Sequence, residues 1–374
     1  MAKALLMPPN PLKEDGRERR VGVEMEMSGI ELSMIACQIN IAFGGRIEEI
    51  SPFEFVIGGT DLGDFKIELD FVYLKNYARE KYRALQTAND SRESQEPKAH
   101  PPGRRPVSSG PKTPLAGAQL DEVLLSELAD MELPDLETMA SEALSLVAKN
   151  VVPLEIVTPP IPLSELHWLD TLVRRLRDHE AKGTRHLLFY AFGVHLNPEL
   201  PNLDVATILR YFRAFLCLHD WLAEEEKVAF SRRVTPFINR FPSDYTRKVV
   251  SPHYCPTQAE FIDDYLDANP SRNRALDLLP LLTWLDEPRV RALLPEEKIG
   301  KRPTFHYRLP NSDVDNPDWS IAQPWNNWVM VERLANQPKL LNEMMWALSR
   351  HLELFSIELV SWKERLKSCV RHLS

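Results

Sequence analysis

The chain has 374 residues, of which 44% are hydrophobic, enough to bury a sizeable core in one large domain or two. Its 45 basic and 54 acidic residues give a formal net charge of -9, which argues against a nucleic acid or an anionic membrane as the main partner. No run reaches the roughly 18 apolar residues that span a bilayer, and the four cysteines form no CxxC pair. We therefore expect no secretory leader, a reducing compartment, and a cytoplasmic location, or a nuclear one in a eukaryote.

The first element with a chemical signature is the stretch Arg20 to Gly29, RVGVEMEMSG. The preceding residues 1–18 are rich in proline and charge, which predicts a flexible, irregular N-terminal arm. Read as a strand, the stretch places four apolar side chains on one face, and Glu24 and Glu26 on the other. Two carboxylates side by side repel each other, so this pattern indicates a nearby cation.

A second alternating strand is predicted over 65–71, with Lys66, Glu68 and Asp70 on its polar face. Between the two strands the apolar spacing predicts a helix over 30–43, ended by Gly44 and Gly45, and short strands over 46–50 and 53–57.

The composition changes from about residue 86 to residue 118, where proline, serine, glycine and charge replace aromatic and branched residues. This composition predicts a disordered or mobile insertion, either a tolerated surface loop, which we favour, or a lid. Helices are predicted after it, over 120–130 and 135–149.

Three further strands with one polar face are predicted in the second half of the chain. They cover 151–158 with Glu155, 192–197 with His195 and Asn197, and 304–309 with His306 and Arg308. The stretch 186–190 also has an extended pattern. The predicted helices between and after these strands cover 164–180, 203–226, 257–268, 274–285, 323–336 and 338–371.

Five strands that are far apart in sequence thus combine an apolar face with acids and histidines. If they share one sheet, their polar faces form an oxygen-rich surface suited to Mg2+ or Mn2+. The alternative is an antiparallel sheet whose polar face is simply exposed to water. For a single strand that alternative is favoured, but its repetition across five strands favours a site.

Other kinds of site find less support in the sequence. The chain has no HExxH motif, no cysteine and histidine quartet, no GxSxG elbow and no GxxxxGK[ST] loop. Cys37 and Cys217 fall within predicted helices, where a small buried thiol is the common outcome. For His219, a position in the core or on the helix surface is favoured over a role as a ligand. The arginines between Arg232 and Arg247 are more often solvated charge than an anion clamp.

The ordered set VGVEMEM, FKIELD, PLEIVTPP, FGVHLN and TFHYRLP resembles the amidoligase branch of the carboxylate-amine ligases, the superfamily of glutamine synthetase and glutamate-cysteine ligase. The resemblance runs from Arg20 to about Gln337. It implies an α+β fold: a glutamine-synthetase-like antiparallel sheet, with helices packed on its apolar face and a polar, metal-binding face. It also implies a single catalytic domain over 19–374, helical from about residue 323.

The resemblance further implies roles for individual residues. Arg308 matches an arginine that contacts the transferring phosphoryl group. The implied metal ligands are Glu24, Glu26, Glu68, Glu155, His195 and His306. Catalytic roles are expected for Arg308, Glu155 and Arg274, and ATP contacts for Arg308, Arg272 and Lys66.

The sequence departs from the family pattern at two of these positions. His306 stands where glutamate is usual, which removes a negative charge and places the second metal site in question. Asp277 replaces the usual asparagine in RNRALDLL, the segment that contains the two candidate anion clamps, Arg272 and Arg274.

The activity that the resemblance implies is an ATP-dependent carboxylate-amine ligase. It would use Mg2+ or Mn2+ and form an amide or isopeptide bond through an acyl phosphate, on an amino acid or peptide carboxylate. Its partners would be that acid and an amine, without nucleic acid or membrane, and the oligomeric state is left open. Two alternatives remain: a catalytically degenerate ligase fold acting as a binding or scaffold module, and a metal-dependent phosphohydrolase.

Overall fold

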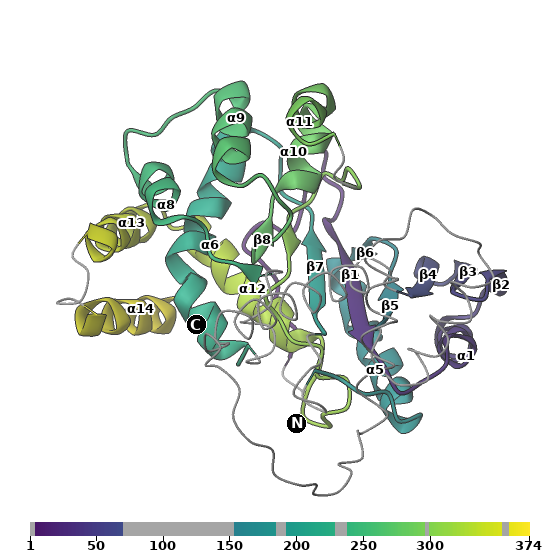
Figure 1. Cartoon of the computed structure of the whole chain (residues 1–374). Coiled ribbons are helices and arrows are strands. Elements are labelled where there is room, and N and C mark those ends of the chain that lie inside the picture. The colour runs from purple at the N-terminus through teal and green to yellow at the C-terminus, as the bar shows by residue number, and fades with distance from the viewer. Residues whose placement is uncertain (1–3, 70–152, 185–191, 229–237, 296–298, 354–358) are drawn as a thin grey trace, which may run out of the picture. The chain divides into compact units, whose positions relative to one another are not determined.

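The computed structural model divides the chain into two units, residues 1–68 with 154–374 and residues 69–153. The first unit contains the sheet described below, apart from Leu69 at the end of one strand (Figure 1). The residues described by the structure are 4–69, 153–184, 192–228, 238–295, 299–353 and 359–374. The predicted insertion at 86–118, the helices at 120–130 and 135–149, and the extended stretch at 186–190 lie outside these residues.

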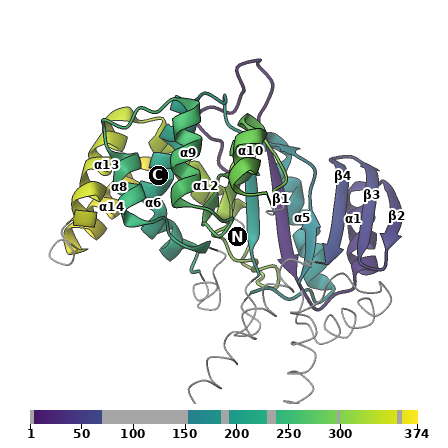
Figure 2. The same cartoon turned by 45° about the horizontal axis from the view of Figure 1, so that its top comes forward.

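The described residues form one sheet in the order β2-β3-β4-β5-β1-β7-β9-β8, with β6 paired to the end of β1. The strand β1 lies between β5 and β7 and is antiparallel to both (Figure 1). Figure 2 shows β2, β3 and β4 at one end of the sheet. All five strands predicted to carry polar faces are members of this sheet, which confirms that prediction. The strands are β1 (Arg20–Met27), β2 (Arg46–Ser51), β3 (Glu54–Thr60), β4 (Gly63–Leu69), β5 (Leu154–Val157), β6 (Ile161–Pro162), β7 (Val194–Pro198), β8 (Leu276–Asp277) and β9 (His306–Tyr307).

Helices cover the apolar side of the sheet. The helices are α1 (Leu32–Phe43), the 3-10 helix η1 (Leu163–Trp168), α5 (Leu169–Asp178), α6 (Val205–Glu225), α8 (Ser243–Val250), α9 (Gln258–Ala268), α10 (Leu279–Leu285), α11 (Glu287–Leu293), α12 (Ala322–Ala335), α13 (Pro338–Glu353) and α14 (Leu359–Leu373). The fold is therefore α+β with an antiparallel sheet, as the family resemblance implied.

Aromatic packing fixes which side chains of β9 point towards the helices. The ring of Tyr307 lies 6.1 Å from that of Phe215 on α6 and 5.5 Å from that of Trp328 on α12. Towards the other end of the sheet, Phe43 at the end of α1 stacks on Phe65 of β4. Because side chains alternate along a strand, burying Tyr307 under α6 and α12 directs His306 to the opposite face of the sheet.

Several predicted helices differ in detail from those observed. The helix predicted over 274–285 is wrong in its first part, because Leu276–Asp277 pair with β9 as strand β8 and the helix α10 begins only at Leu279. Pro280 sits in the first turn of that helix, where proline is tolerated. The single helix predicted over 338–371 is instead two helices, α13 and α14, which pack against each other. The helix predicted over 164–180 begins with the 3-10 turn η1.

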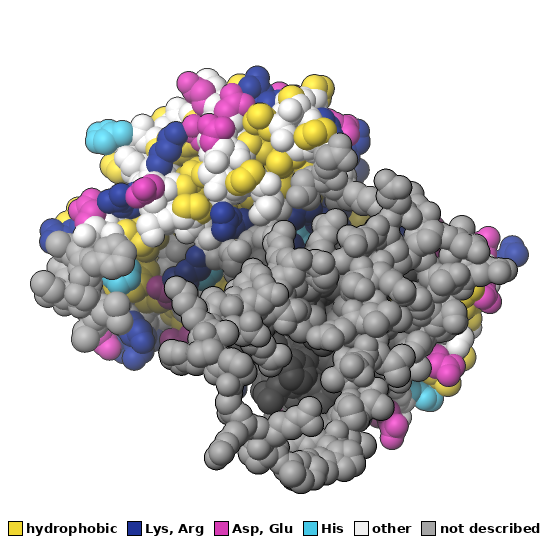
Figure 3. All heavy atoms as spheres, viewed as in Figure 1, with side chains coloured by type: hydrophobic (Ala, Val, Ile, Leu, Met, Phe, Trp, Pro, Cys, Tyr) yellow, Lys and Arg dark blue, Asp and Glu magenta, His cyan; other side chains and the backbone are white. Residues whose placement is uncertain are grey.

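Part of the N-terminal arm lies against α12. The backbone N–H of Leu6 donates to Asn326 Oδ1 at 2.8 Å, and Trp325 Nε1 donates to the Leu6 carbonyl at 2.8 Å. On the face seen in Figure 3, acidic and basic side chains are interspersed over the described residues. No helix among the described residues is long and apolar enough to cross a bilayer.

Candidate functional site

The strand register brings the predicted acids and histidines together on one face. Glu24 of β1 is paired with His195 of β7, and Glu26 of β1 with Glu155 of β5. Residues directly opposite each other in an antiparallel pair point to the same face, so their side chains meet. His306 of β9 completes the row, with its Nδ1 lying 2.7 Å from Asn197 Oδ1 on β7.

A hydrogen-bonded network holds these side chains in place. Glu24 lies at its centre, with Oε2 at 3.2 Å from His195 Nδ1 and Oε1 accepting from Asn197 Nδ2 at 3.0 Å. The other carboxylate of β1, Glu26, accepts from the backbone N–H of Gly193 at 2.6 Å. Glu24, Glu26 and His306 are all less than 9% exposed, so the network is largely withdrawn from water.

Arg302 supplies a positive charge to the network, since its guanidinium donates to Glu24 Oε1 at 2.5 Å. The arginine side chain is one-third exposed and reaches the buried carboxylate from the edge of the site. In this way the buried carboxylate of Glu24 has a cationic partner from the protein itself.

Burial and charge act in opposite directions on the acids and bases of the site. Burial by itself would raise the pKa of Glu24, but His306, His195 and Arg302 hold it well below its usual range. Burial lowers the pKa of His306 well below its usual range, and the nearby Glu24 only partly opposes this effect. Both pKa shifts are in the direction that favours the metal-binding form of each group, the carboxylate of Glu24 and the uncharged imidazole of His306.

Two groups of side chains in the network have the spacing of metal ligands. Glu24, His195 and His306 form the first cluster, and Glu26, Glu155 and His195 form the second. In each cluster the ligand atoms lie within 4.8 Å of one another. Buried carboxylates and imidazoles that converge in this way fit a divalent cation, because the cation offsets the mutual repulsion of the acids.

Two arginines and an aspartate border this network. Arg308 Nη1 donates to the Arg272 carbonyl at 2.7 Å, and Arg272 Nε donates to Asp277 Oδ2 at 3.0 Å. Burial lowers the pKa of Arg308, and Arg272 lowers it further, whereas Asp277, Glu26 and Glu24 raise it. Arg308 thus lies within the electrostatic field of the acids, where it could contact an anion bound beside them.

Three residues predicted to act at the site make contacts outside the two clusters. Lys66 Nζ is 2.8 Å from Glu68 Oε2 and 3.3 Å from Glu54 Oε1, and Glu68 belongs to neither cluster. Arg274 donates to Asn269 Oδ1 at 2.7 Å and to the Arg240 carbonyl at 2.7 Å, contacts that join it to the end of α9. The roles predicted for Lys66, Glu68 and Arg274 stay predictions.

Sequence reasoning missed Arg302 and gave no individual role to Asn197. The sequence did contain a signal for Arg302. His306 and Arg308 alternate onto the polar face, and the same alternation, continued towards the N-terminus, places Arg302 on that face. The contact itself joins residues 278 positions apart and follows only from the sheet register.

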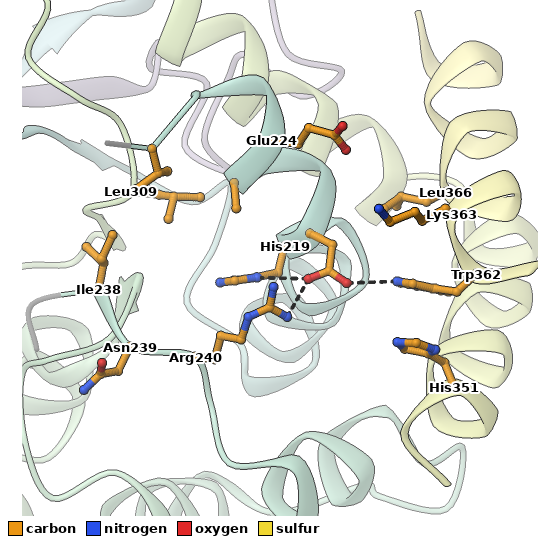
Figure 4. A pocket seen from close by; sticks show the side chains of 13 residues that line it. His219, Glu224, Ile238, Asn239, Arg240, Leu309, His351, Trp362, Lys363 and Leu366 are labelled. Carbon is orange, nitrogen blue, oxygen red and sulfur yellow. Dashed lines mark hydrogen bonds and ion pairs between the residues drawn. The ribbon is translucent and has the colours of Figure 1, made fainter. Parts of the chain in front are cut away.

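A second polar cluster lies on the helical side of the sheet and lines a cavity of about 930 Å3 (Figure 4). Asp220 of α6 is 3.6 Å from His219 Nδ1 and 2.5 Å from Arg240 Nη1, and its Oδ2 accepts from Trp362 Nε1 at 3.0 Å. Among the described residues that line this cavity, none belongs to the two acid and histidine clusters. His219 is buried, which is one of the two positions expected for it. Of the two cysteines predicted to be buried, Cys217 is buried, whereas Cys37 is exposed.

Comparison with known protein families gives a match over most of the chain. The model of a family described as "Putative amidoligase enzyme" matches residues 17–330, which include every strand of the sheet. The chain therefore belongs to the amidoligase family, as the ordered motifs indicated. The comparisons with curated proteins and with solved structures returned no match.

Proposed function

We propose that the protein is an ATP-dependent carboxylate-amine ligase that forms an amide or isopeptide bond on an amino acid or peptide carboxylate. The observation that carries this proposal is the convergence of Glu24, Glu26, Glu155, His195 and His306 from four strands on one sheet face. Membership of the amidoligase family supports the reaction type.

The reaction would occur in two steps. The substrate carboxylate attacks the γ-phosphorus of ATP, forming an acyl phosphate and releasing ADP. The amine then attacks the acyl carbon, the C–O bond to phosphate breaks, and phosphate and a proton leave. Divalent ions held by the two clusters would neutralise and orient the phosphates of ATP.

The protein's own side chains would position the reactants. Arg308 lies beside the acids and is the proposed donor to the phosphoryl group in transfer, where a preorganised guanidinium stabilises developing charge. The Gly193 N–H fixes the carboxylate of Glu26, and Asn197 fixes that of Glu24. Arg272, oriented by Asp277, is the proposed second contact for an anionic group.

The test is to incubate the chain with ATP, Mg2+ or Mn2+, and mixtures of amino acids or peptides, and to follow ADP and amide formation. We expect both products together, and a fall in rate of at least about a hundredfold in Arg308→Gln. We also expect loss of ADP formation when Glu24→Gln and Glu26→Gln are combined. The control is Lys363→Gln on α14, at the cavity on the helical side of the sheet, which should leave the rate unchanged. ADP formation that survives the double substitution would contradict the metal-site assignment.

The pairing of Arg302 with Glu24 favours a second candidate, a degenerate ligase fold that serves as a binding or scaffold module. In that case the guanidinium would replace a metal ion as the partner of the carboxylate. Calorimetry separates the two, because only the ligase should bind ATP more tightly when Mg2+ or Mn2+ is present. Phosphate release without any amine would instead indicate a phosphohydrolase.

A further inference from the structure

The two candidate metal clusters differ in their chemistry. Glu24, His195 and His306 offer two imidazoles and one carboxylate, whereas Glu26, Glu155 and His195 offer one imidazole and two carboxylates. His195 belongs to both, with Nδ1 directed at Glu24 and Nε2 lying 3.8 Å from Glu26 Oε1. A neutral imidazole has one lone pair, so His195 can serve only one of the two clusters at a time.

Asn197 determines which nitrogen of His306 can bind an ion. Its Nδ2 donates to Glu24 Oε1, an oxygen that also accepts from Arg302. The amide is therefore oriented with Oδ1 towards His306, 2.7 Å from Nδ1, and this nitrogen must carry the proton. The lone pair of His306 is thus left on Nε2, and hydrogen bonding of this kind is how proteins orient a metal-binding histidine.

We propose that the cluster of Glu24, His195 and His306 selects a divalent transition-metal ion, such as Mn2+, over Mg2+. The cluster would bind the ion through His306 Nε2, His195 Nδ1 and Glu24, and His195 would then carry its proton on Nε2, which faces Glu26 Oε1 at 3.8 Å. Imidazole suits the transition ions, whereas Mg2+ prefers oxygen ligands and gives up its waters reluctantly. Glu26 and Glu155 are then left as an oxygen-only pair that suits Mg2+. This inference rests on the metal centre of the proposed function, though not on its ligase chemistry.

The proposal is tested on the full chain after treatment with a chelator, without ATP or substrate. Mn2+ binding is followed by its electron paramagnetic resonance signal, and Mg2+ binding by competition. We expect the site that fills first to bind Mn2+ at least about a hundredfold more tightly than it binds Mg2+. In His306→Glu, a carboxylate replaces the imidazole, and this preference should fall by at least about tenfold. His253→Gln, which removes an exposed imidazole between α8 and α9, is the control and should keep the preference.

A preference below about tenfold in the unmodified chain, or one that His306→Glu leaves unchanged, overturns the proposal. A measurement that needs no variant guards against misfolding of His306→Glu. The spin-echo modulation of Mn2+ bound to the unmodified chain should show coupling to two imidazole nitrogens, and its absence overturns the proposal as well.

Asn197→Leu tests the positioning role of Asn197, because leucine has a similar size but cannot orient either partner. We expect the affinity for Mn2+ to fall by about 10- to 100-fold. The Mn2+ that still binds should keep its coupling to the two imidazole nitrogens. Unchanged affinity would overturn the role given to Asn197. These outcomes are independent of the ligase assay: an intact Mn2+ preference without amide formation rejects only the proposed function, and amide formation without the preference rejects only this inference.

Discussion

Burying the carboxylate of Glu24 is unfavourable by itself, and contacts within the protein offset this cost. The residue is only 8% exposed, and its carboxylate receives hydrogen bonds from Asn197 and Arg302 and lies beside His195. Each contact offsets part of the cost of removing the charge from water. A divalent ion at the same place would take over the role that Arg302 has in the described structure, so metal binding and the Arg302 contact should compete.

The buried histidine of the second polar cluster predicts how stability depends on pH. Burial lowers the pKa of His219, so the unfolded chain binds a proton at this residue more readily than the folded chain does. Above the unfolded pKa of about 6.5 both states are neutral and the residue contributes nothing, whereas below it the free energy of unfolding falls as pH falls.

We therefore expect His219→Gln to flatten this decline between about pH 6.5 and pH 5. The measurement is urea unfolding at half-unit pH steps, and His253→Gln, an exposed histidine, controls for the loss of one imidazole. A decline in His219→Gln as steep as in the unmodified chain would contradict the assignment.

At the scale of elements, the structure separates strands that carry the site from helices that support it. β1 and β7 pair over five residues, from Val21–Pro198 to Met25–Val194, and this register places Glu24 opposite His195. A shift of one residue would turn every site carboxylate of β1 to the apolar side. The two-residue strand β9 has fewer backbone contacts, and the packing of Tyr307 against α6 and α12 compensates by fixing its orientation.

The helix α9 begins with a capping box that should contribute to stability independently of the site. Thr257 Oγ1 accepts from the Glu260 N–H at 3.3 Å, and the Thr257 N–H donates to Glu260 Oε2 at 2.8 Å. We expect Thr257→Ala to lower the free energy of unfolding by about 1 kcal/mol, measured by urea denaturation. Ser243→Ala at the start of α8, where no side chain caps the helix, should change it by less than about 0.5 kcal/mol. Equal losses in the two variants would show that the cap contributes nothing specific.

At the scale of the whole molecule, a buried ion pair joins the beginning of the sheet to α12. Arg19, directly before β1, donates to both carboxylate oxygens of Glu332 at 2.7 Å, and neither side chain is more than 1% exposed. Arg19 also donates to the Asn10 carbonyl, and Trp328 Nε1 donates to Glu332 at 2.8 Å. The pair fixes residues 313 positions apart and holds the N-terminal segment against the helical layer.

Because a buried charge without its partner is costly, we expect Glu332→Gln to lower the free energy of unfolding by about 3–5 kcal/mol. Combining Arg19→Met with Glu332→Leu should restore a large part of the loss, since apolar side chains of similar volume need no partner. Urea denaturation of the single and double variants measures the coupling. Strictly additive losses would contradict a direct pairing between the two side chains.

The sequence by itself determined the strands and much of the site. Alternation of apolar and polar residues identified Glu24, Glu26, Glu155, His195 and His306, because a period of two is a local property of the chain. The ordered motifs identified the amidoligase family, because they too can be read from the sequence alone. The sequence did not predict the short strand β8, and it predicted one helix where the structure has α13 and α14. Partners distant in sequence stabilise these elements.

Only the tertiary structure decided how these residues are used. The register of β1 with β5 and β7 divides the acids and histidines into two clusters that share His195, and folding brings Arg302 to Glu24 and Asn197 to His306. It also directs Lys66, Glu68 and Arg274 into other contacts, although their residue types and pattern resemble those of the site. Distances between side chains depend on strand pairing across more than a hundred residues, and no local pattern encodes that pairing.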